Sequence, residues 1–536
     1  MFLHHNRLYS VKKGKKKICM LKEKFRFDEV IGFCLFGLSI ILLIIMLLLG
    51  LNQAIWWDDA YSIISISESF KNMIINTAVD VHPPLYYIIL KYICQFFNMF
   101  NSSEEFTILV GKLTSAIPMF LLLCFSFVCL KKNLGWLVCG IFALCIVTMP
   151  NMMHFAVEIR MYSWVMFFLT ISFYYSYNII KDNNKKNWII FTIFSLLSSY
   201  THYYGLIATG FIYLFLLAHI LFKNRSLLKK WIISLIVSVL AYVPWVYIFI
   251  TNSEYFTSDQ WAIPSFDYLI EVIKFIFSTP IHYIEADNYQ FDQTGLGLGI
   301  LLFILFISLY ILHTYRSYKE DEHSKHEHSK QFLVYGGVLI LIATICFAYL
   351  FTVSIKPMIY VKYVFPMLGC LWLSFSVLLS NFYSKNKIIF TIGLTILLLN
   401  ASISCINFAT FESGEKNAYY DFKNVANQIN DNDSIIYLGG SGSAFFRPIY
   451  FKDKKKNETF FYYENSSYFE NKSLLYSNIN EYLTKGNVYV IQSLREDINI
   501  TTFNNSMVDI GFSLKEIVKI RKSHAYPHSI YLVEHH

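Results

Sequence analysis

The stretch between residues 56 and 87 gathers the side chains best suited to acid–base chemistry. It begins Trp-Trp-Asp-Asp-Ala-Tyr-Ser and ends Asp-Val-His-Pro-Pro-Leu-Tyr-Tyr, so that Asp58, Asp59, Asp80 and His82 lie close together in the chain. A carboxylate within hydrogen-bond reach of a hydroxyl group can take its proton as that group attacks. The stretch follows an apolar run long enough to cross a bilayer, and ionisable groups near lipid are costly to keep. We therefore predict that it forms one wall of an active site.

The composition indicates a polytopic membrane protein with a smaller polar part. Of the 536 residues, 55% are hydrophobic and 15% are charged, whereas soluble domains carry roughly 25% charged residues. The net charge of +8 would suit a nucleic-acid partner, but the Lys and Arg residues fall in short clusters between apolar runs. Such clusters are typical of cytoplasmic loops. We therefore expect membrane lipids, and no nucleic acid, as partners.

The sequence contains about eleven apolar runs that could span the membrane as helices, some of them short. They cover approximately residues 28–51, 107–130, 134–150, 161–180, 187–203, 204–222, 231–250, 295–315, 332–352, 358–380 and 388–407.

The basic clusters set the expected orientation, because basic loops stay in the cytoplasm. Residues 1–27 are predicted to form a basic cytoplasmic N-terminus before a retained signal anchor, since the apolar run that follows is too long for a cleaved signal peptide. The segment 84–100 must then not cross, because otherwise Lys131–Lys132 and every later basic loop would lie outside. We therefore place the first outer loop at residues 52–106. The protein is expected in the plasma membrane, with its N-terminus inside and its C-terminus outside.

The same topology brings five more polar residues to the outer face, where we expect them to meet the first outer loop around one site. They are Glu158, Arg160, Tyr162, His202 and Lys362.

The chain is predicted to divide into a membrane domain, residues 28–410, and a small extracytoplasmic α/β domain, residues 411–536. The second domain alternates short elements of the two kinds. We expect helices at 421–430 and 474–483 and strands at 434–438, 460–463, 488–492 and 530–533.

The two strings in the first outer loop resemble those of the GT-C glycosyltransferases of the family 39, protein O-mannosyltransferase-like type, which are related to the lipid A aminoarabinose transferases. The string Glu-Ile-Arg-Met-Tyr at 158–162 resembles the second outer-loop motif of that family, and Thr-His-Tyr-Tyr at 201–204 resembles its outer histidine turn. Lys362-Tyr363 stands where an Arg-Tyr pair is common. The resemblance covers about residues 28–407.

The resemblance implies a polytopic helical membrane protein of the GT-C type that transfers a sugar, of the hexosyl or mannosyl kind, from a polyprenyl-phosphate-linked donor. The acceptor would be a hydroxyl group on a glycan, lipid or protein outside the cytoplasm. One-step displacement would invert the anomeric centre. In such enzymes a first-loop Asp is the general base, which by position here implies Asp58.

The resemblance also distributes roles among the remaining residues. Asp59 and Asp80 would join Asp58 in the catalytic set. The expected substrate- and phosphate-binding residues are His82, Glu158, Arg160, Tyr162, His202 and Lys362. A divalent metal is the one candidate cofactor, and Asp80, His82 and His202 are its candidate ligands.

Two positions depart from the family pattern. The first acidic pair is usually Asp-Glu, whereas Asp59 here is shorter by one methylene group. Lys362 replaces the usual Arg, which keeps the charge but removes the two-pronged grip on phosphate.

Each of these residues also has a structural interpretation. Asp58 and Asp59 could cap the following helix, and Asp80 could cap the helix that begins at the Pro-Pro pair. Glu158 and Arg160 could form an ion pair, and Lys362 could extend its amino group to the membrane interface. His82 and His202 could be structural hydrogen-bonding residues.

Two other functions remain open at this stage. A transporter or flippase of lipid-linked saccharides would place charges near mid-membrane in broken helices and carry an inverted repeat. The acids here lie in loops and no repeat is visible in the sequence, so this alternative is the weaker one. A membrane scaffold whose C-terminal domain binds a partner is the third interpretation.

Overall fold

The structure is a computed structural model. It describes residues 27–80, 82–252, 267–280, 282–285, 288–290, 293–320, 325–355, 358–438, 457–461, 472–493, 500–520 and 528–536. The predicted basic cytoplasmic segment therefore lies outside the described residues, apart from its last residue.

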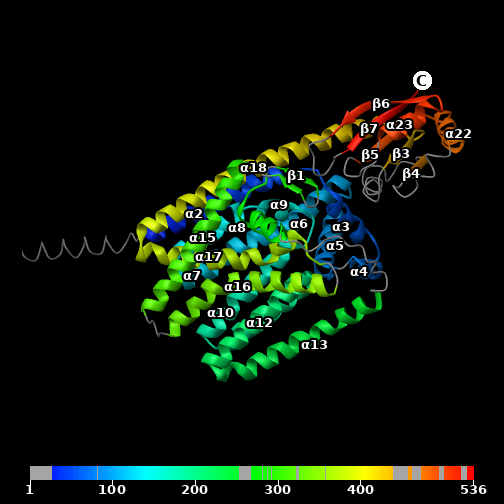
Figure 1. The fold of residues 1–536 in the computed structure, drawn as a ribbon. Helices are drawn as coiled ribbons and strands as arrows, with labels where there is room; N and C mark the ends of the chain where they lie inside the picture. Colours follow the sequence, from blue (N-terminus) through cyan, green and yellow to red (C-terminus); the bar gives the residue numbers. More distant parts are fainter. Residues whose placement is uncertain are drawn as a thin grey trace, which may run out of the picture.

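Each of the eleven predicted spans coincides with helical structure (Figure 1). The helices are α2 (Phe27–Gly50), α6 (Glu104–Phe125) continued by η1 (Ser126–Leu130) and α7 (Lys131–Leu134), α8 (Trp136–Thr148), α10 (Tyr162–Lys181), α11 (Lys185–Thr201), α12 (Tyr203–Lys223), α13 (Leu228–Asn252), α15 (Gln293–Glu320), α16 (Lys325–Ser354), α17 (Phe365–Lys385) and α18 (Lys387–Ala426). Within the described residues, eight helices are long and apolar enough to cross a membrane, and α8, α10 and α11 are not among them. The chain is thus a multi-pass membrane protein.

The segment 52–106, which the sequence predicts as the first outer loop, contains three short helices before α6. These are α3 (Trp57–Ser67), α4 (Phe70–Val79) and α5 (Leu85–Asn98). Helix α5 has 14 residues and, like α8, α10 and α11, is not among the helices of the described chain that are long and apolar enough to cross a membrane. The prediction that the segment 84–100 does not cross stays a prediction. Helix α5 buries Tyr86, Tyr87 and Leu90 in a cluster that also contains Trp164 of α10. This packing attaches the loop to one end of the helical bundle.

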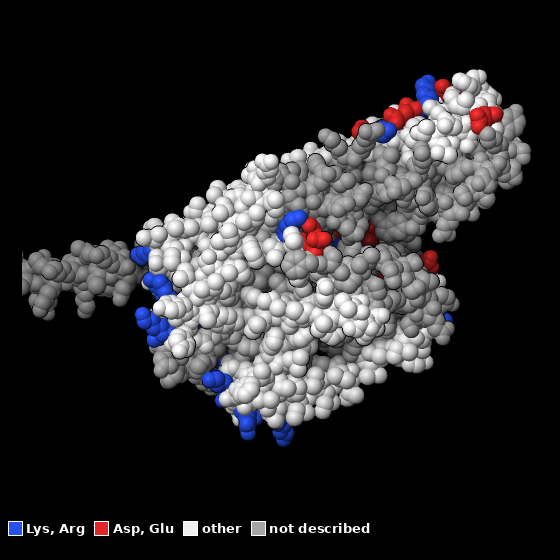
Figure 2. Space-filling model, in the orientation of Figure 1, with Lys and Arg blue, Asp and Glu red and all other residues white. Residues whose placement is uncertain are grey.

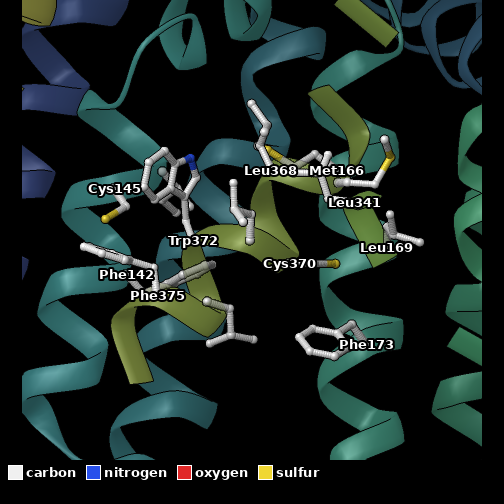
Figure 3. Packing of buried hydrophobic residues seen from close by; sticks show 14 of the residues in the cluster. Phe142, Cys145, Met166, Leu169, Phe173, Leu341, Leu368, Cys370, Trp372 and Phe375 are labelled. Atoms are coloured by element: carbon white, nitrogen blue, oxygen red, sulfur yellow. The ribbon is translucent and has the colours of Figure 1, made fainter. Parts of the chain in front are cut away.

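Helix α17 runs through the centre of the bundle. In its membrane-length segment 89% of the residues are buried, against 17% for the peripheral helix α13. Figure 3 shows Trp372 of α17 beside Cys145 of α8, while Cys370, two residues earlier, points toward Leu169 and Phe173 of α10. Large and small side chains therefore interdigitate on both sides of α17, which fixes the segment that precedes it at the site.

Helices α2 and α8 approach each other through two glycines. A Cβ atom added to Gly32 would lie 2.2 Å from the carbonyl oxygen of Trp136, and one added to Gly140 would lie 2.1 Å from that of Gly32. Small residues are typical of close helix contacts in membranes, because they let the backbones touch. This contact holds the helix that leads into the first outer loop.

The C-terminal part is a small five-stranded sheet with helices. Its strands are β3 (Ser434–Leu438), β4 (Asn457–Phe461), β5 (Val488–Ser493), β6 (Phe512–Lys519) and β7 (His528–His535), in the order β4-β3-β5-β7-β6. Strands β4, β3 and β5 are parallel, and β7 is antiparallel to β5 and to β6. The helices are α22 (Lys472–Leu483) and α23 (Ile500–Val508).

The sequence predicts most of this domain but misses two elements. All four predicted strands are present, and the predicted helix at 474–483 is α22. Helix α23 and strand β6 were not predicted, and β6 exposes much of its length. The predicted helix at 421–430 is largely the end of α18, which continues without a break out of the bundle. The sheet packs on this extension through Tyr419 and Phe422.

Charge is distributed unevenly along the bundle. In the view of Figure 2, most Lys and Arg side chains of the helical part gather at the end opposite to the sheet domain, near the position of α7 in Figure 1. Helix α7 carries Lys131 and Lys132. This distribution is the one expected if the basic loops share one side of the membrane.

Gly32→Ala should destabilise the fold, because the added methyl group meets the α8 backbone. Overpacking of this kind costs about 1–3 kcal/mol. Gly37→Ala, in the same helix, is the matched control, since nothing lies within 4 Å of its added Cβ atom. Thermal unfolding of the purified protein in detergent measures the difference. Equal melting temperatures for the two variants would contradict the close packing of α2 on α8.

Candidate active site

Asp59 fixes the beginning of α3 to a distant loop. Its Oδ2 accepts a hydrogen bond from the backbone N–H of Trp56 at 3.1 Å, and its Oδ1 accepts one from the N–H of Ile159 at 2.6 Å. The helix-capping interpretation thus describes a contact that Asp59 makes. The hydrogen bond from Ile159 is a long-range contact in addition to the cap. It connects α3 with the segment between α9 (Met152–Val157) and α10.

Asp58 lies at the centre of a buried charge cluster. Its Oδ2 is 2.8 Å from Nζ of Lys362 and 3.7 Å from Nε of Arg160. Lys362 belongs to η4 (Val361–Val364), directly before α17, so the rigid central helix determines its position. The side chains of Lys362 and Arg160 are only 11% and 5% exposed. Lys362 therefore does not extend to the membrane interface, and Arg160 pairs with Asp58.

Neighbouring carboxyl groups in this cluster have opposite pKa shifts. Burial by itself would raise the pKa of Asp58, but the charges of Arg160 and Lys362 outweigh burial and hold it well below its usual range. Burial raises the pKa of Asp59 to about 6 and that of Glu158 to about 8. Asp58 is thus ionised at neutral pH, whereas Glu158 largely retains its proton. Environments that separate titratable groups in this way are frequent at functional sites.

Two buried donors beside the cluster have no hydrogen-bond partner among the described residues. They are Nε of Arg160 and the hydroxyl group of Tyr162. The 3.7 Å separation between Arg160 Nε and Asp58 is an ion pair but too long for a hydrogen bond. The other side of the guanidinium is occupied, since Nη1 donates to the hydroxyl of Tyr87 at 2.8 Å. Buried donors are normally satisfied, so both donors lack an acceptor.

Aromatic rings enclose the amino group of Lys362. Its Nζ lies 4.8 Å from the ring of Trp56, 5.2 Å from that of Tyr360 and 5.6 Å from that of Tyr162. Ring faces attract a cation and exclude water from it. The cluster is thus a dry cationic site, where the charge of Lys362 acts strongly on whatever binds beside it.

The two histidines lie next to each other at the edge of this cluster. Their ring centroids are 5.8 Å apart, and Nδ1 of His82 lies 3.0 Å from Oδ2 of Asp80. Nδ1 of His202 accepts the N–H of Tyr204 at 3.0 Å and so caps α12. Burial lowers the pKa of His202 well below its usual range, which makes this ring neutral.

Asp80, His82 and His202 do not fit a metal ion as a set. Asp80 and His82 use their facing atoms on each other, and one nitrogen of His202 is already bonded to backbone. Across the described ranges, no group of three or more His, Cys, Asp or Glu side chains is placed to hold a metal ion. Asp80 lies at the C-terminal end of α4, and the residue before α5 is Pro84. Asp80 therefore does not cap α5, so the structural interpretation given for this residue is wrong.

All nine predicted site residues lie near the same end of the bundle, but several of their neighbours were not predicted from the sequence. These are Asn52, Trp56, Lys112, Glu412 and Glu415, which lie around Asp59 and Glu158. Lys112 did carry a signal, because it is the one charged residue in the predicted span 107–130 and ionisable residues inside spans mark functional sites. Glu412 and Glu415 carried none, since they lie in a polar part of the sequence.

Removing Asp58 should destabilise the protein by about 3–5 kcal/mol, because two buried cations lose their carboxylate. Removing Lys362 should cost less, because Asp58 still pairs with Arg160. The double variant Asp58→Asn/Lys362→Met should lose less than the sum of the single losses, by about 1–3 kcal/mol. Unfolding in mixed detergent micelles measures all four proteins. The exposed pair Glu105–Lys423 is the control, with an expected coupling of about 0–1 kcal/mol. Additive losses at Asp58 and Lys362 would contradict the ion pair.

The raised pKa of Glu158 should make stability depend on pH. Between its ordinary pKa of 4.5 and its folded value of about 8, the folded protein holds a proton that the unfolded chain has lost, so stability falls as pH rises through this window. Glu158→Gln should flatten this part of the melting-temperature profile. Glu481→Gln, an exposed carboxyl in the sheet domain, should leave the profile unchanged. A wild-type profile that rises from pH 5 to 8, or one that Glu158→Gln does not alter, would refute the shift.

This chain resembles known proteins in its three-dimensional structure and not in its sequence. No protein-family model and no curated protein sequence matches the chain. The structure of ArnT from Cupriavidus metallidurans in the apo state superposes with a TM-score of 0.54 at 10% sequence identity, covering 92% of this chain and 97% of that one. The structure of the same protein bound to undecaprenyl phosphate gives a TM-score of 0.51 at 10% identity, covering 93% and 97%. The chain therefore has the ArnT-like GT-C fold, followed by a small C-terminal sheet domain.

Proposed function

We propose that this protein is a membrane glycosyltransferase that moves a sugar from a polyprenyl-phosphate-linked donor to a hydroxyl acceptor outside the cytoplasm. One observation carries the proposal. Lys362 and Arg160 share a single carboxylate oxygen of Asp58 in a buried site, and two donors beside them lack an acceptor. A phosphate group has the charge and the number of oxygens that such a site lacks.

The fold supports the nature of the donor. An ArnT of the same fold has been crystallised with undecaprenyl phosphate. A phosphate at the end of a polyprenyl chain needs cations at the edge of a membrane-embedded bundle. Arg160 and Lys362 stand at such a place, since each lies in a short connection at the beginning of a bundle helix, α10 or α17.

In the proposed reaction the acceptor hydroxyl attacks the anomeric carbon while the bond from that carbon to the phosphate oxygen breaks. The bonding electrons leave with the phosphate, where Lys362, Arg160 and the Tyr162 hydroxyl stabilise the charge. Asp58 takes the hydroxyl proton as general base. A single displacement of this kind inverts the anomeric centre. The sugar would be a hexose, mannose-like by the sequence resemblance.

An exchange of partners would make Asp58 a stronger base when the donor arrives. In the free protein, Arg160 and Lys362 depress the pKa of Asp58, so that its carboxylate binds a proton weakly. A phosphate that takes these two cations also adds its own negative charge nearby, and both changes raise the pKa of Asp58. The base would thus gain strength only when the leaving group is in position.

We further propose that the site faces away from the cytoplasm, with the N-terminus inside. The basic residues cluster at the end of the bundle opposite to the sheet domain (Figure 2), and basic loops stay inside. Residues 28–410 would then be the catalytic membrane domain. Residues 411–536 would be an extracytoplasmic domain on the side where the acceptor arrives.

A transporter of lipid-linked saccharides is the alternative function. It would need charges in broken helices near mid-membrane, whereas Asp58, Arg160 and Lys362 come from short connections and loop helices at one end of the bundle. A transporter would move an intact lipid-linked sugar across vesicles without cleaving the sugar–phosphate bond. Release of free polyprenyl phosphate therefore distinguishes the two functions.

Purified wild-type protein should release polyprenyl phosphate from a polyprenyl-phosphate hexose in the presence of a hydroxyl acceptor. Lys362→Gln should lower the rate by about 10²–10³-fold, the usual effect of removing one transition-state donor. Lys362→Arg should retain most of the activity, since it keeps the charge and can grip phosphate with two N–H groups. Asp58→Asn should be nearly inactive because it cannot take the proton.

Lys274→Gln is the control for the loss of one lysine near the same end of the bundle, since Lys274 pairs with Glu271 on α14 (Asp267–Phe277) and does not contact the cluster. Its rate should equal that of the wild type. Equal turnover by wild type and Asp58→Asn would remove Asp58 as the base. No release from any polyprenyl-phosphate sugar would remove the proposed function.

A further inference from the structure

Helix α5 and the two residues after it present an apolar face that the protein leaves uncovered. Four aromatic or aliphatic side chains there are more than half exposed, namely Tyr92, Phe96, Met99 and Phe100. Gln95 is the one exposed polar side chain of the helix. Residues four positions apart, such as Tyr92 and Phe96, lie on the same side of a helix. An exposed apolar patch of this kind marks a contact with another molecule or with lipid.

The charge of α5 is turned away from this face. Of the residues of α5, all of which the structure describes, Lys91 alone is charged. Lys91 is buried, and its Nζ donates to the carbonyl of Ile66 at 2.6 Å and to that of Glu68. These bonds satisfy carbonyl groups at the end of α3. The lysine therefore serves the protein interior, and the outer face of α5 is uncharged.

Helix α4, which precedes α5 in the same segment, has a different surface. Beside Phe70 and Val79, its exposed residues are Lys71, Asn72 and Asn76. A face that mixes charged, polar and apolar side chains is ordinary for a helix in water, whereas a helix that is apolar on every accessible side is surrounded by protein or lipid. The two helices therefore lie in different surroundings.

The position of α5 is fixed along the first half of α6. The hydroxyl groups of Tyr86 and Ser115 are 2.7 Å apart near the beginning of α5. At its other end, the hydroxyl of Thr107 donates to Oδ1 of Asn98 at 3.1 Å. The two helices therefore run antiparallel, and the exposed face of α5 adjoins the outer surface of α6.

That outer surface of α6 belongs to a helix long and apolar enough to cross the membrane. Its exposed side chains Leu113, Ile117 and Phe120 recur at the helical spacing, so they form one stripe toward lipid. Helix α5 continues this stripe sideways. Its 14 residues correspond to about 21 Å, which is shorter than the hydrocarbon core of about 30 Å.

We propose that α5 docks on the membrane through its exposed face, and that lipid at the membrane interface covers Tyr92, Phe96 and Phe100. Phe and Tyr are typical of helices that lie in this region. The opposite face of α5 carries Tyr87, whose hydroxyl accepts Nη1 of Arg160. The docked helix therefore sets the depth of Arg160 relative to the lipid headgroups. This docking is independent of the reaction that the charge cluster performs.

Photoreactive phosphatidylcholines in nanodiscs test the docking on the wild-type protein. One lipid carries a diazirine near the headgroup and another carries it at the end of an acyl chain, and mass spectrometry locates the adducts. The first lipid should label Tyr92 and Phe96 about as strongly as Leu113 of α6. The second should label Phe120, near the middle of the membrane-length segment Glu104–Leu134, and leave α5 unlabelled. Neither lipid should label Asn76 of α4.

Phe96→Asp tests whether the contact with lipid holds the helix in place. Backbone N–H exchange of residues 85–98, measured in nanodiscs, should become faster, because a carboxylate draws this face out of the lipid. Asn76→Asp is the matched control, since it adds the same group at an exposed position of α4. It should leave the exchange of residues 85–98 at the wild-type rate.

Three results would overturn the docking. The first is labelling of Leu113 without labelling of Tyr92 or Phe96, as expected if a protein partner or a second copy of this chain covered the face. The second is labelling of α5 by the chain-end lipid as strongly as Phe120, which would mean that the helix crosses the membrane. The third is wild-type exchange of residues 85–98 in Phe96→Asp.

Discussion

The site depends on the burial of two cations against one carboxylate. Taking Lys362 and Arg160 out of water is costly, and Asp58 is the anion that offsets this cost in the free protein. Asp58 lies in α3, whereas Arg160 and Lys362 lie in the segments before α10 and α17. Their pairing therefore requires these three parts of the chain to be held together. The hydrogen bonds of Asp59 and the packing of α17 provide that restraint. The elements around the site therefore serve to hold Asp58, Arg160 and Lys362 against one another.

The sequence predicts the fold, and it predicts that these polar residues gather at one end of the bundle, for physical reasons that can be named. An apolar run as long as the bilayer is thick must form a helix, because unpaired backbone groups are costly in lipid. The basic clusters between the runs then predict which loops lie on the cytoplasmic side. Asp58 and Lys362 are 304 positions apart, so no local pattern relates them. They could be expected to meet only because the topology places both at the same face and because both lie in strings that resemble one family.

The contacts within the site could not be predicted in the same way. Apart from the family resemblance, nothing in the sequence distinguishes Asp58, which holds the cations, from Asp59, which accepts two backbone N–H groups. The difference arises from the direction in which each side chain leaves the helix, and this depends on where α3 begins. The acidic wall formed by Glu412 and Glu415 was missed because α18 continues past the apolar run, which composition does not reveal.

The length of α18 has a mechanical consequence. The helix has 40 residues without interruption, which corresponds to a rod of about 60 Å. One of its faces carries Glu412, and a few turns later Tyr419 and Phe422 hold the sheet. Because the helix is continuous, the terminal sheet and the carboxyl groups of Glu412 and Glu415 are carried by one and the same rod. The position of the sheet relative to the charge cluster is therefore set by a single helix and by no flexible linker.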